Sequence, residues 1–182
     1  MLVVDSVLGV GPVVSVVVDD RLFTPVKWPD GLVSPIWVNE NLIDIEVTPG
    51  SAAGQPTTID WRPKTASYTV ETQATTVGAS ETTALKVTEP SPGRLLVTGK
   101  IAVAKTPTLV VSEISDPSAY ARTAFIEALQ RAGVTVTATP TGPNPAAKLP
   151  AKDSYQAANK LGEHVSADLA AYSKLIMKVS YN

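Results

Sequence analysis

Cysteine is absent from this 182-residue chain, and histidine occurs only once. Without cysteine the chain can form neither a disulfide framework nor a thiol nucleophile. A single histidine, His164, leaves no His-rich metal site and no obvious Ser-His-Asp relay. No apolar run reaches the ~20 residues that a transmembrane segment needs. The apolar N-terminus lacks the basic leader of a signal peptide, so any export leader is expected to lie outside this chain.

The chain also has almost no net charge and few aromatic residues. Lys and Arg total 15 against 17 Asp and Glu, which excludes the strongly basic footprint of a nucleic-acid-binding protein. Hydrophobic residues make up 44% of the chain and aromatics 5%, and Val and Thr are abundant in their place. Both are stiff β-branched residues that favour pleated surfaces. With 15 Pro and 11 Gly, this composition predicts a folded, turn-rich chain in which sheet predominates.

Alternating hydrophobicity marks the clearest strand. Ile43, Ile45 and Val47 fall on one side and Asp44 and Glu46 on the other, which predicts a strand with one wet face. Turn residues separate several further strand-like runs, and this spacing predicts an antiparallel all-β segment. These runs cover residues 13–18, 57–61, 68–72, 83–87, 95–101 and 108–114.

Helices are expected mainly in the last third of the chain. Asp116 is placed to cap one, with Pro117 in its first turn and Gly133 at its end. A second helix is expected from Ser166, with Asp168 in its first turn. Leu169, Tyr172, Ile176 and Val179 form one apolar stripe along it.

Four weaker patterns accompany these elements. Residues 2–8 are compatible with a short helix, residues 24–35 with an irregular loop, and residues 134–138 with a strand. Residues 140–153 hold four prolines and are expected to form a surface connection.

One short motif carries chemistry. Penicillin-binding serine enzymes combine Ser-x-x-Lys, Ser-x-Asn and Lys-Thr-Gly, and Ser180-Tyr181-Asn182 matches the second. Taken alone it is more simply interpreted as a polar helix end, since so short a pattern arises by chance. No Ser-x-x-Lys occurs in the sequence, and Lys105-Thr106-Pro107 is no Lys-Thr-Gly because proline lacks the N–H and the backbone freedom of glycine.

The order of several segments gives the motif its context, and together they resemble the low-molecular-mass class C penicillin-binding proteins, the D-alanyl-D-alanine carboxypeptidase/endopeptidase family. The resemblance spans about residues 13–182. The segments are Val16-Val17-Val18-Asp19-Asp20-Arg21-Leu22-Phe23, Trp28-Pro29, Ser34-Pro35, Val38-Asn39-Glu40-Asn41, Val47-Thr48-Pro49-Gly50, Leu96-Val97-Thr98-Gly99, Asp116-Pro117-Ser118-Ala119-Tyr120, Leu161-Gly162-Glu163-His164-Val165-Ser166 and Lys174-Leu175-Ile176-Met177-Lys178-Val179-Ser180-Tyr181-Asn182.

The resemblance implies an α+β fold. In the family, accessory domains are inserted into a penicillin-recognising catalytic domain, between Ser-x-x-Lys and Ser-x-Asn. Residues 1–165 would then be an antiparallel β-rich accessory region with a few helices, including a small sub-domain around residues 50–105. Residues 166–182 would be a C-terminal helix that begins the returning catalytic segment, so the chain is expected to be a fragment.

The family also implies an activity and a site. The intact protein would be a serine-type hydrolase of peptidoglycan stem peptides, acting through an acyl-serine intermediate and blocked by β-lactams, in the periplasm or cell wall. Ser180 would relay a proton and Asn182 would orient the substrate amide. This chain alone is expected to be inactive, and neither a metal nor an organic cofactor is implied.

Two further expectations concern partners. Asp20 and Phe23 resemble a segment beside the family's catalytic groove, where a carboxylate next to an aromatic ring could hold the ammonium of a diamino acid; a simple strand end and turn is the plainer interpretation. The apolar stripe of the 166–179 helix is expected to mediate self-association or to leave its family position.

The alternative to the enzyme is a non-enzymatic, secreted β-rich binding or scaffold module in which Ser180-Tyr181-Asn182 is accidental.

Overall fold

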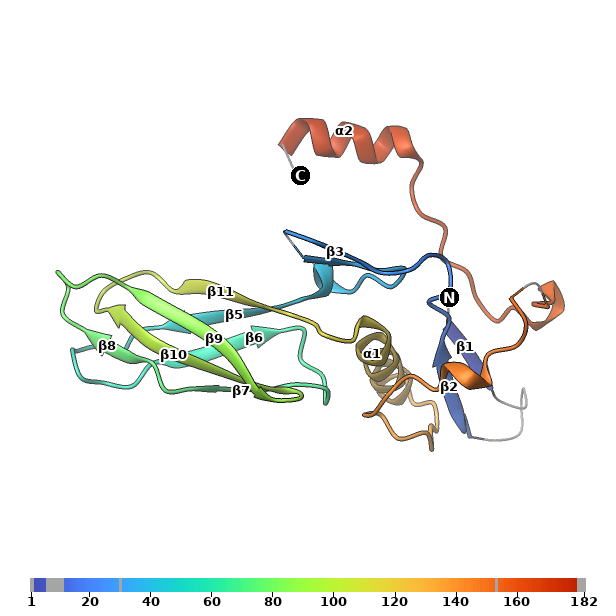
Figure 1. The fold of residues 1–182 in the computed structure, drawn as a ribbon, viewed down its shortest axis with the longest axis horizontal. Helices are drawn as coiled ribbons and strands as arrows, with labels where there is room; N and C mark the ends of the chain where they lie inside the picture. The colour runs from blue at the N-terminus through green and yellow to red at the C-terminus, as the bar shows by residue number, and fades with distance from the viewer. Residues whose placement is uncertain (1, 6–11, 30, 153, 180–182) are drawn as a thin grey trace. The chain divides into compact units, whose positions relative to one another are not determined.

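The protein is represented by a computed structural model that describes residues 2–5, 12–29, 31–152 and 154–179. The chain divides into two compact units, Met1–Leu149 and Pro150–Asn182. Among the described residues, the first unit holds the strands and the α-helix α1 (Pro117–Arg131), and the second holds the α-helix α2 (Leu169–Val179) (Figure 1). The sequence-based boundary between residues 165 and 166 stays a prediction.

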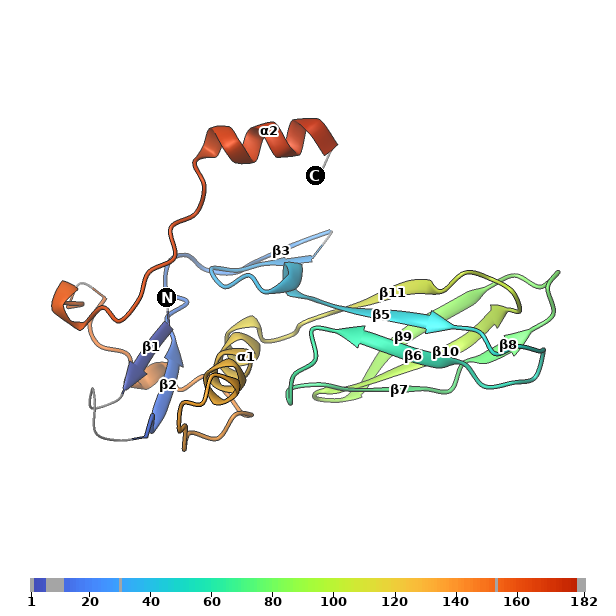
Figure 2. The same cartoon turned by 180° about the vertical axis from the view of Figure 1, so that it is seen from behind.

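A β-sandwich forms the larger part of the first unit (Figures 1 and 2). In one sheet β5 (Leu42–Thr48) lies between β11 (Thr108–Glu113) and β6 (Thr58–Arg62), both antiparallel to it. In the other, β10 (Arg94–Ala102) pairs with β9 (Ala84–Ser91) in an antiparallel hairpin. The free side of β10 is covered by two collinear strands, β7 (Thr69–Thr72) and β8 (Thr75–Val77), which run parallel to it.

The sandwich core follows from the alternation in the sequence. Ile43, Ile45 and Val47 are fully buried, while Glu46 between them is exposed. They pack with Leu95 and Val97 of β10 in one apolar cluster that spans both sheets. Burying each such side chain contributes roughly 1.5–3 kcal/mol, so this cluster dominates the stability of the sandwich.

A second, smaller core joins β2 (Ser15–Val18) to α1 (Pro117–Arg131). Val16 of β2 and Ile126 of α1 are fully buried in it. β1 (Leu2–Asp5) pairs antiparallel with β2 on one edge. The helix is fixed to the sandwich as well, because Tyr120 of α1 is 1% exposed within the sandwich core.

A separate hairpin, β3 (Val26–Trp28) with β4 (Gly31–Val33), precedes the sandwich. The 3-10 helix η1 (Asn39–Asn41) links it to β5, and all three of its residues have positive φ. Asn41 is fully buried, and its amide donates hydrogen bonds to the carbonyls of Leu32 (3.1 Å) and Ile36 (3.2 Å). This side chain therefore ties the hairpin to the start of β5.

The second unit is largely irregular before α2 (Leu169–Val179). The 3-10 turn η3 (Ala157–Asn159) lies inside it, whereas η2 (Ala146–Lys148) lies at the end of the first unit. Asp168 caps α2 by accepting a hydrogen bond from the Ala171 amide at 2.7 Å.

Most sequence predictions of the elements are confirmed, and the α+β class with mainly antiparallel strands is correct. Four were wrong. Residues 2–5 of the expected 2–8 helix form a strand, while residues 6–8 lie outside the described residues; residues 26–28 pair with 31–33 in a hairpin; and residues 134–138 make only an isolated bridge from Val136 to Val13. The pairing of β7 and β8 with one edge of β10 is parallel, whereas the hairpin with β9 on its other edge is antiparallel.

Candidate functional site

The two residues that match the penicillin-binding motif, Ser180 and Asn182, lie outside the described residues. The structure does describe the helix that leads to them. α2 begins at Leu169, three residues later than predicted, because Asp168 is its cap rather than a first-turn residue. The roles of Ser180 and Asn182 therefore stay predictions.

Asp20 lies just after β2, at the beginning of α1. Its carboxylate accepts a hydrogen bond from the Ser118 hydroxyl at 2.5 Å. Ser118 is in the first turn of α1, where the helix dipole favours a negative charge. The neighbouring Asp19 pairs with Arg21 at 2.7 Å. Asp20 thus has a structural partner, and one of its oxygens is already engaged.

Phe23 follows in the segment that leads to the hairpin and is 43% exposed. Trp28 and Trp37 are 59% and 53% exposed. Exposed tryptophans are uncommon because of their large apolar area. The segment from Phe23 to Trp37 therefore presents aromatic surface to solvent, as a contact region requires.

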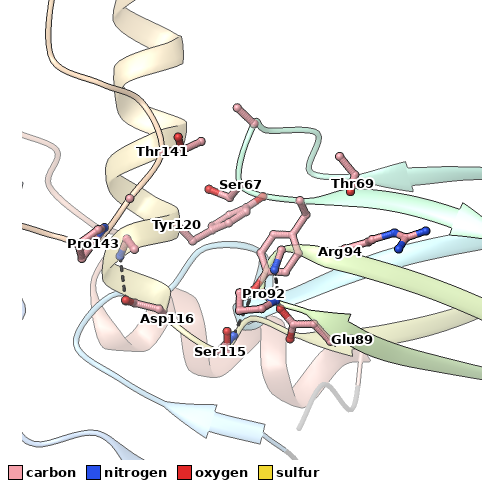
Figure 3. A pocket seen from close by; sticks show the side chains of 15 residues that line it. Ser67, Thr69, Glu89, Pro92, Arg94, Ser115, Asp116, Tyr120, Thr141 and Pro143 are labelled. Atoms are coloured by element: carbon pink, nitrogen blue, oxygen red, sulfur yellow. Dashed lines mark hydrogen bonds between the residues drawn. The ribbon is translucent and has the colours of Figure 1, made fainter.

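A groove of about 570 Å³ lies where α1 meets one end of the sandwich (Figure 3). This groove could not be predicted from the sequence, because its walls come from segments that are far apart along the chain. Tyr68 and Tyr120 form its base, with their ring centroids 5.9 Å apart. The walls are the start of β7, the turn between β9 and β10, the N-terminus of α1 and residues 141–143.

Several polar groups of this groove form hydrogen bonds or ion pairs within the protein. Glu89 accepts a hydrogen bond from the Gly93 amide at 2.8 Å, and Asp116 accepts one from the Ala119 amide at 2.9 Å. The guanidinium of Arg94 points along the strands, away from Tyr120, and pairs with Glu71 at 2.7 Å (Figure 3). This hydrogen bond lowers the pKa of the Glu71 carboxyl and raises the pKa of Arg94. The charged groups are therefore largely engaged within the protein.

Tyr120 is buried at the groove. Its hydroxyl donates to the Pro63 carbonyl at 3.2 Å. Burial raises the pKa of Tyr120 above its ordinary value of 10.0, because the phenolate would be poorly solvated there. Tyr120 is therefore neutral at physiological pH and serves as a packing anchor rather than a base.

The loop that forms one wall of the groove is held by side chains of α1. Arg122 is only 7% exposed; its guanidinium donates to the carbonyls of Val16 (2.8 Å) and Pro140 (3.1 Å). Burial lowers the pKa of Arg122. Thr123 donates to the same Pro140 carbonyl at 2.8 Å. A buried arginine that binds carbonyls leaves no signature in the sequence.

In the part of the chain that the structure describes, no cluster of three or more His, Cys, Asp or Glu side chains is arranged to hold a metal ion. Among the described helices, none has the length and apolarity to cross a bilayer.

The comparisons with known proteins identify the family. The model of the D-Ala-D-Ala carboxypeptidase 3 (S13) family matches residues 9–182, so this chain belongs to that family. This confirms the resemblance to class C penicillin-binding proteins inferred from the ordered segments. A search of curated proteins found no match.

Two solved structures of penicillin-binding protein 4 from Haemophilus influenzae are similar to the chain. One, in complex with a novel β-lactam, is 18% identical with a TM-score of 0.48, over 60% of this chain and 26% of that chain. The other is 18% identical with a TM-score of 0.50, over 58% of this chain and 23% of that chain. The second likeness supports a shared fold. This chain aligns with only about a quarter of the length of either structure.

Proposed function

We propose that this chain is the accessory region, together with the helix that leads to Ser-x-Asn, of a serine-type D-Ala-D-Ala carboxypeptidase or endopeptidase. The observation that carries the proposal is the family match, which runs through the sandwich and α2 to the Ser180-Tyr181-Asn182 motif. In this proposal residues 1–165 are the inserted region and residues 166–182 belong to the catalytic domain. The substrate is the peptidoglycan stem peptide, and the protein acts in the periplasm or cell wall.

Ser180 and Asn182 act on the substrate only with partners from elsewhere in the catalytic domain. Acylation needs a nucleophilic serine activated by a neighbouring base. Ser180 passes a proton between that serine, its lysine and the leaving amine, and Asn182 donates a hydrogen bond that orients the substrate amide. Since the sequence contains neither Ser-x-x-Lys nor Lys-Thr-Gly, this chain alone does not form an acyl-enzyme with substrate or with a β-lactam.

The natural gene product provides the test. An antibody raised against this chain is used on cell-envelope extracts that have been labelled with a fluorescent penicillin. The enzyme proposal predicts that the antibody and the fluorescent label mark the same band, larger than 19.1 kDa. An unlabelled band at the mass of this chain would contradict it and would support the binding or scaffold module. The feature that supports this module is the sandwich, because its apolar core lies entirely within the first unit.

Asp20 and Phe23 are proposed to contact the diamino acid of the stem peptide. The exposure of Phe23 and the carboxylate of Asp20 support this, although Ser118 engages one oxygen of Asp20. Titration of the isotopically labelled chain with a stem peptide should shift the resonances of Asp20 and Phe23, and Asp20→Asn should weaken the shifts. Unchanged resonances at both residues would overturn this contact.

Self-association through the 166–179 helix is the remaining proposal. Leu169, Tyr172 and Ile176 of the predicted stripe are exposed, at 79%, 47% and 45%. Leaving several large apolar side chains in water forfeits roughly 1.5–3 kcal/mol for each one that could be buried. Truncation before Ser166 should leave the first unit folded and make the chain more monomeric. If truncation unfolds the whole chain, the helix belongs to the core of the first unit instead.

A further inference from the structure

The carboxylate of Asp20 forms no ion pair among the described residues. Its hydrogen-bond partner there is the hydroxyl of Ser118, a neutral donor, at 2.5 Å. The neighbouring Arg21 binds Asp19 instead, through Nε at 2.8 Å and a terminal nitrogen at 2.7 Å. Asp20 is half-buried, so a ligand can still reach it from solvent. One carboxylate oxygen of Asp20 therefore accepts no hydrogen bond from the part of the chain that the structure describes.

The backbone is held on both sides of Asp20. Val18, two residues earlier, exchanges two hydrogen bonds with the Asn144 side chain, at 2.9 and 2.8 Å. On the other side the Arg21 amide donates to the Asp19 carboxylate at 3.1 Å, which closes a turn around Asp20. The main chain is thus fixed at this point, and the freedom that remains is rotation of the Asp20 side chain.

Ser118 restricts that rotation. It lies in the first turn of α1, 98 positions from Asp20 in the sequence. The helix itself is fixed, because Ile126 of α1 is fully buried in one cluster with Val16 of β2. A hydrogen bond from a fixed element selects one of the staggered rotamers of the carboxylate. Orienting a binding group before its ligand arrives reduces the entropy that is lost on binding.

The contact is not needed to cap the helix. An acidic side chain beside the first turn is favoured by the helix dipole, but the cap of α1 is Asp116. Its carboxylate accepts a hydrogen bond from the Ala119 amide at 2.9 Å. Asp20 is bound by a side-chain hydroxyl of the helix instead. The hydrogen bond from Ser118 therefore sets the direction of the Asp20 carboxylate rather than completing the helix terminus.

A primary ammonium suits the remaining oxygen of Asp20. Metal ions in proteins require several ligands, and the described residues offer no group of three acidic or histidine side chains arranged for one. An ammonium has three donors and forms a strong charge-assisted hydrogen bond with a single carboxylate oxygen. We propose that Ser118 is a positioning residue that holds Asp20 for the ammonium of the diamino acid. This inference rests on the proposed function, in which Asp20 contacts the stem peptide.

Peptide titration of the isotopically labelled full chain tests the role of Ser118, with the Asp20 resonances as the readout. The probes are a stem peptide with a free side-chain amine on its diamino acid and the same peptide with that amine acetylated. Ser118→Ala should weaken binding of the free-amine peptide about fivefold, the effect of one hydrogen bond. Binding of the acetylated peptide should not change, and Ser118→Thr, which keeps the hydroxyl, should bind like the wild type.

A matched control and a double substitution separate positioning from a structural effect. Ser51→Ala removes a hydroxyl that also bonds a side chain, Gln55 at 3.0 Å, and should leave peptide binding unchanged. In the Asp20→Asn background, Ser118→Ala should weaken binding no further, because the carboxylate that it orients is gone. Circular dichroism checks that each variant keeps the fold.

The outcomes distinguish this inference from the proposed contact of Asp20. Wild-type affinity in Ser118→Ala, an equal loss with the acetylated peptide, or additive losses in the double variant would each overturn the role of Ser118 and leave the contact of Asp20 standing. A free-amine peptide that shifts no Asp20 resonance of the wild type would overturn the contact itself, and the role of Ser118 with it.

Discussion

The side chain of Asn144 binds Val18 as a neighbouring β-strand would. Its Oδ1 accepts from the Val18 amide at 2.9 Å, and its Nδ2 donates to the Val18 carbonyl at 2.8 Å. β1 occupies the other edge of β2. Together with Arg122, which binds the Val16 carbonyl, Asn144 satisfies an edge that would otherwise be buried without partners.

Replacing Asn144 with alanine should therefore destabilise the first unit. Two hydrogen bonds to a buried backbone are lost, which is expected to lower the free energy of unfolding by about 2 kcal/mol. Chemical denaturation followed by circular dichroism measures this. Asn159→Ala, at an exposed position, should change stability by less than about 0.5 kcal/mol. Equal effects of the two substitutions would show that the contact with Val18 contributes nothing specific.

Gly99 in β10 is the second sensitive position. Its φ is 107°, and a Cβ there would lie 2.1 Å from the Ala84 carbonyl oxygen on the paired strand. Gly99→Ala must therefore separate β9 from β10, and we expect a loss of at least about 2 kcal/mol of stability. Gly162→Ala is the control, because nothing lies within 4 Å of a Cβ at that site. A thermal midpoint unchanged in Gly99→Ala would contradict the described register.

The sequence predicted those parts of the fold that depend on local pattern. The alternation around Ile45 located β5 and its buried face, and Asp116 with Pro117 located the start of α1. The parallel pairing of β8 with β10 could not be predicted, because it depends on which strands meet after the chain has folded. The short hairpin of β3 and β4 was obscured by Pro29 between the strands and by Pro25 and Pro35 on either side.

The sequence predicted only those residues of the candidate site that belong to a short sequence motif. Ser180 and Asn182 were found by spacing, and their roles stay predictions. The groove was not predicted, because Tyr68 and Tyr120 are 52 positions apart in the sequence and meet only through packing. The contact between Asp20 and Ser118 was missed for the same reason: the two residues meet only when α1 packs beside β2.

High pH should weaken the protein through Tyr120. Its pKa is raised in the folded state by burial, so the unfolded chain releases this proton more readily. The free energy of unfolding should then fall as the pH rises from the ordinary tyrosine pKa of 10.0 toward the raised pKa of the folded state. Below about pH 10 the ionisation of Tyr120 should leave the free energy of unfolding unchanged. Tyr120→Phe should make the fall shallower above about pH 10, while costing about 1 kcal/mol at pH 7 through the lost bond to Pro63. An unchanged slope in the variant would refute this assignment.

Limited proteolysis should separate the two units. Residues 154–168 are almost entirely exposed and make few buried contacts, so this segment should open locally far more easily than the sandwich. Trypsin is expected to cut first after Lys152 or Lys160, leaving a resistant fragment that contains the first unit. Mass spectrometry of the early products identifies the sites. First cuts after Lys86 or Lys105, within the sandwich sequence, would contradict the division at Leu149.

Centrally, we propose that this chain is an accessory and Ser-x-Asn-bearing part of a D-Ala-D-Ala carboxypeptidase and that it lacks the nucleophilic serine. The most direct measurement is the intact mass of the purified chain after incubation with a β-lactam. The account predicts an unmodified mass, because acylation needs an activated serine and no Ser-x-x-Lys is present. A stoichiometric covalent adduct, at Ser112, Ser118, Ser180 or any other serine, would contradict it.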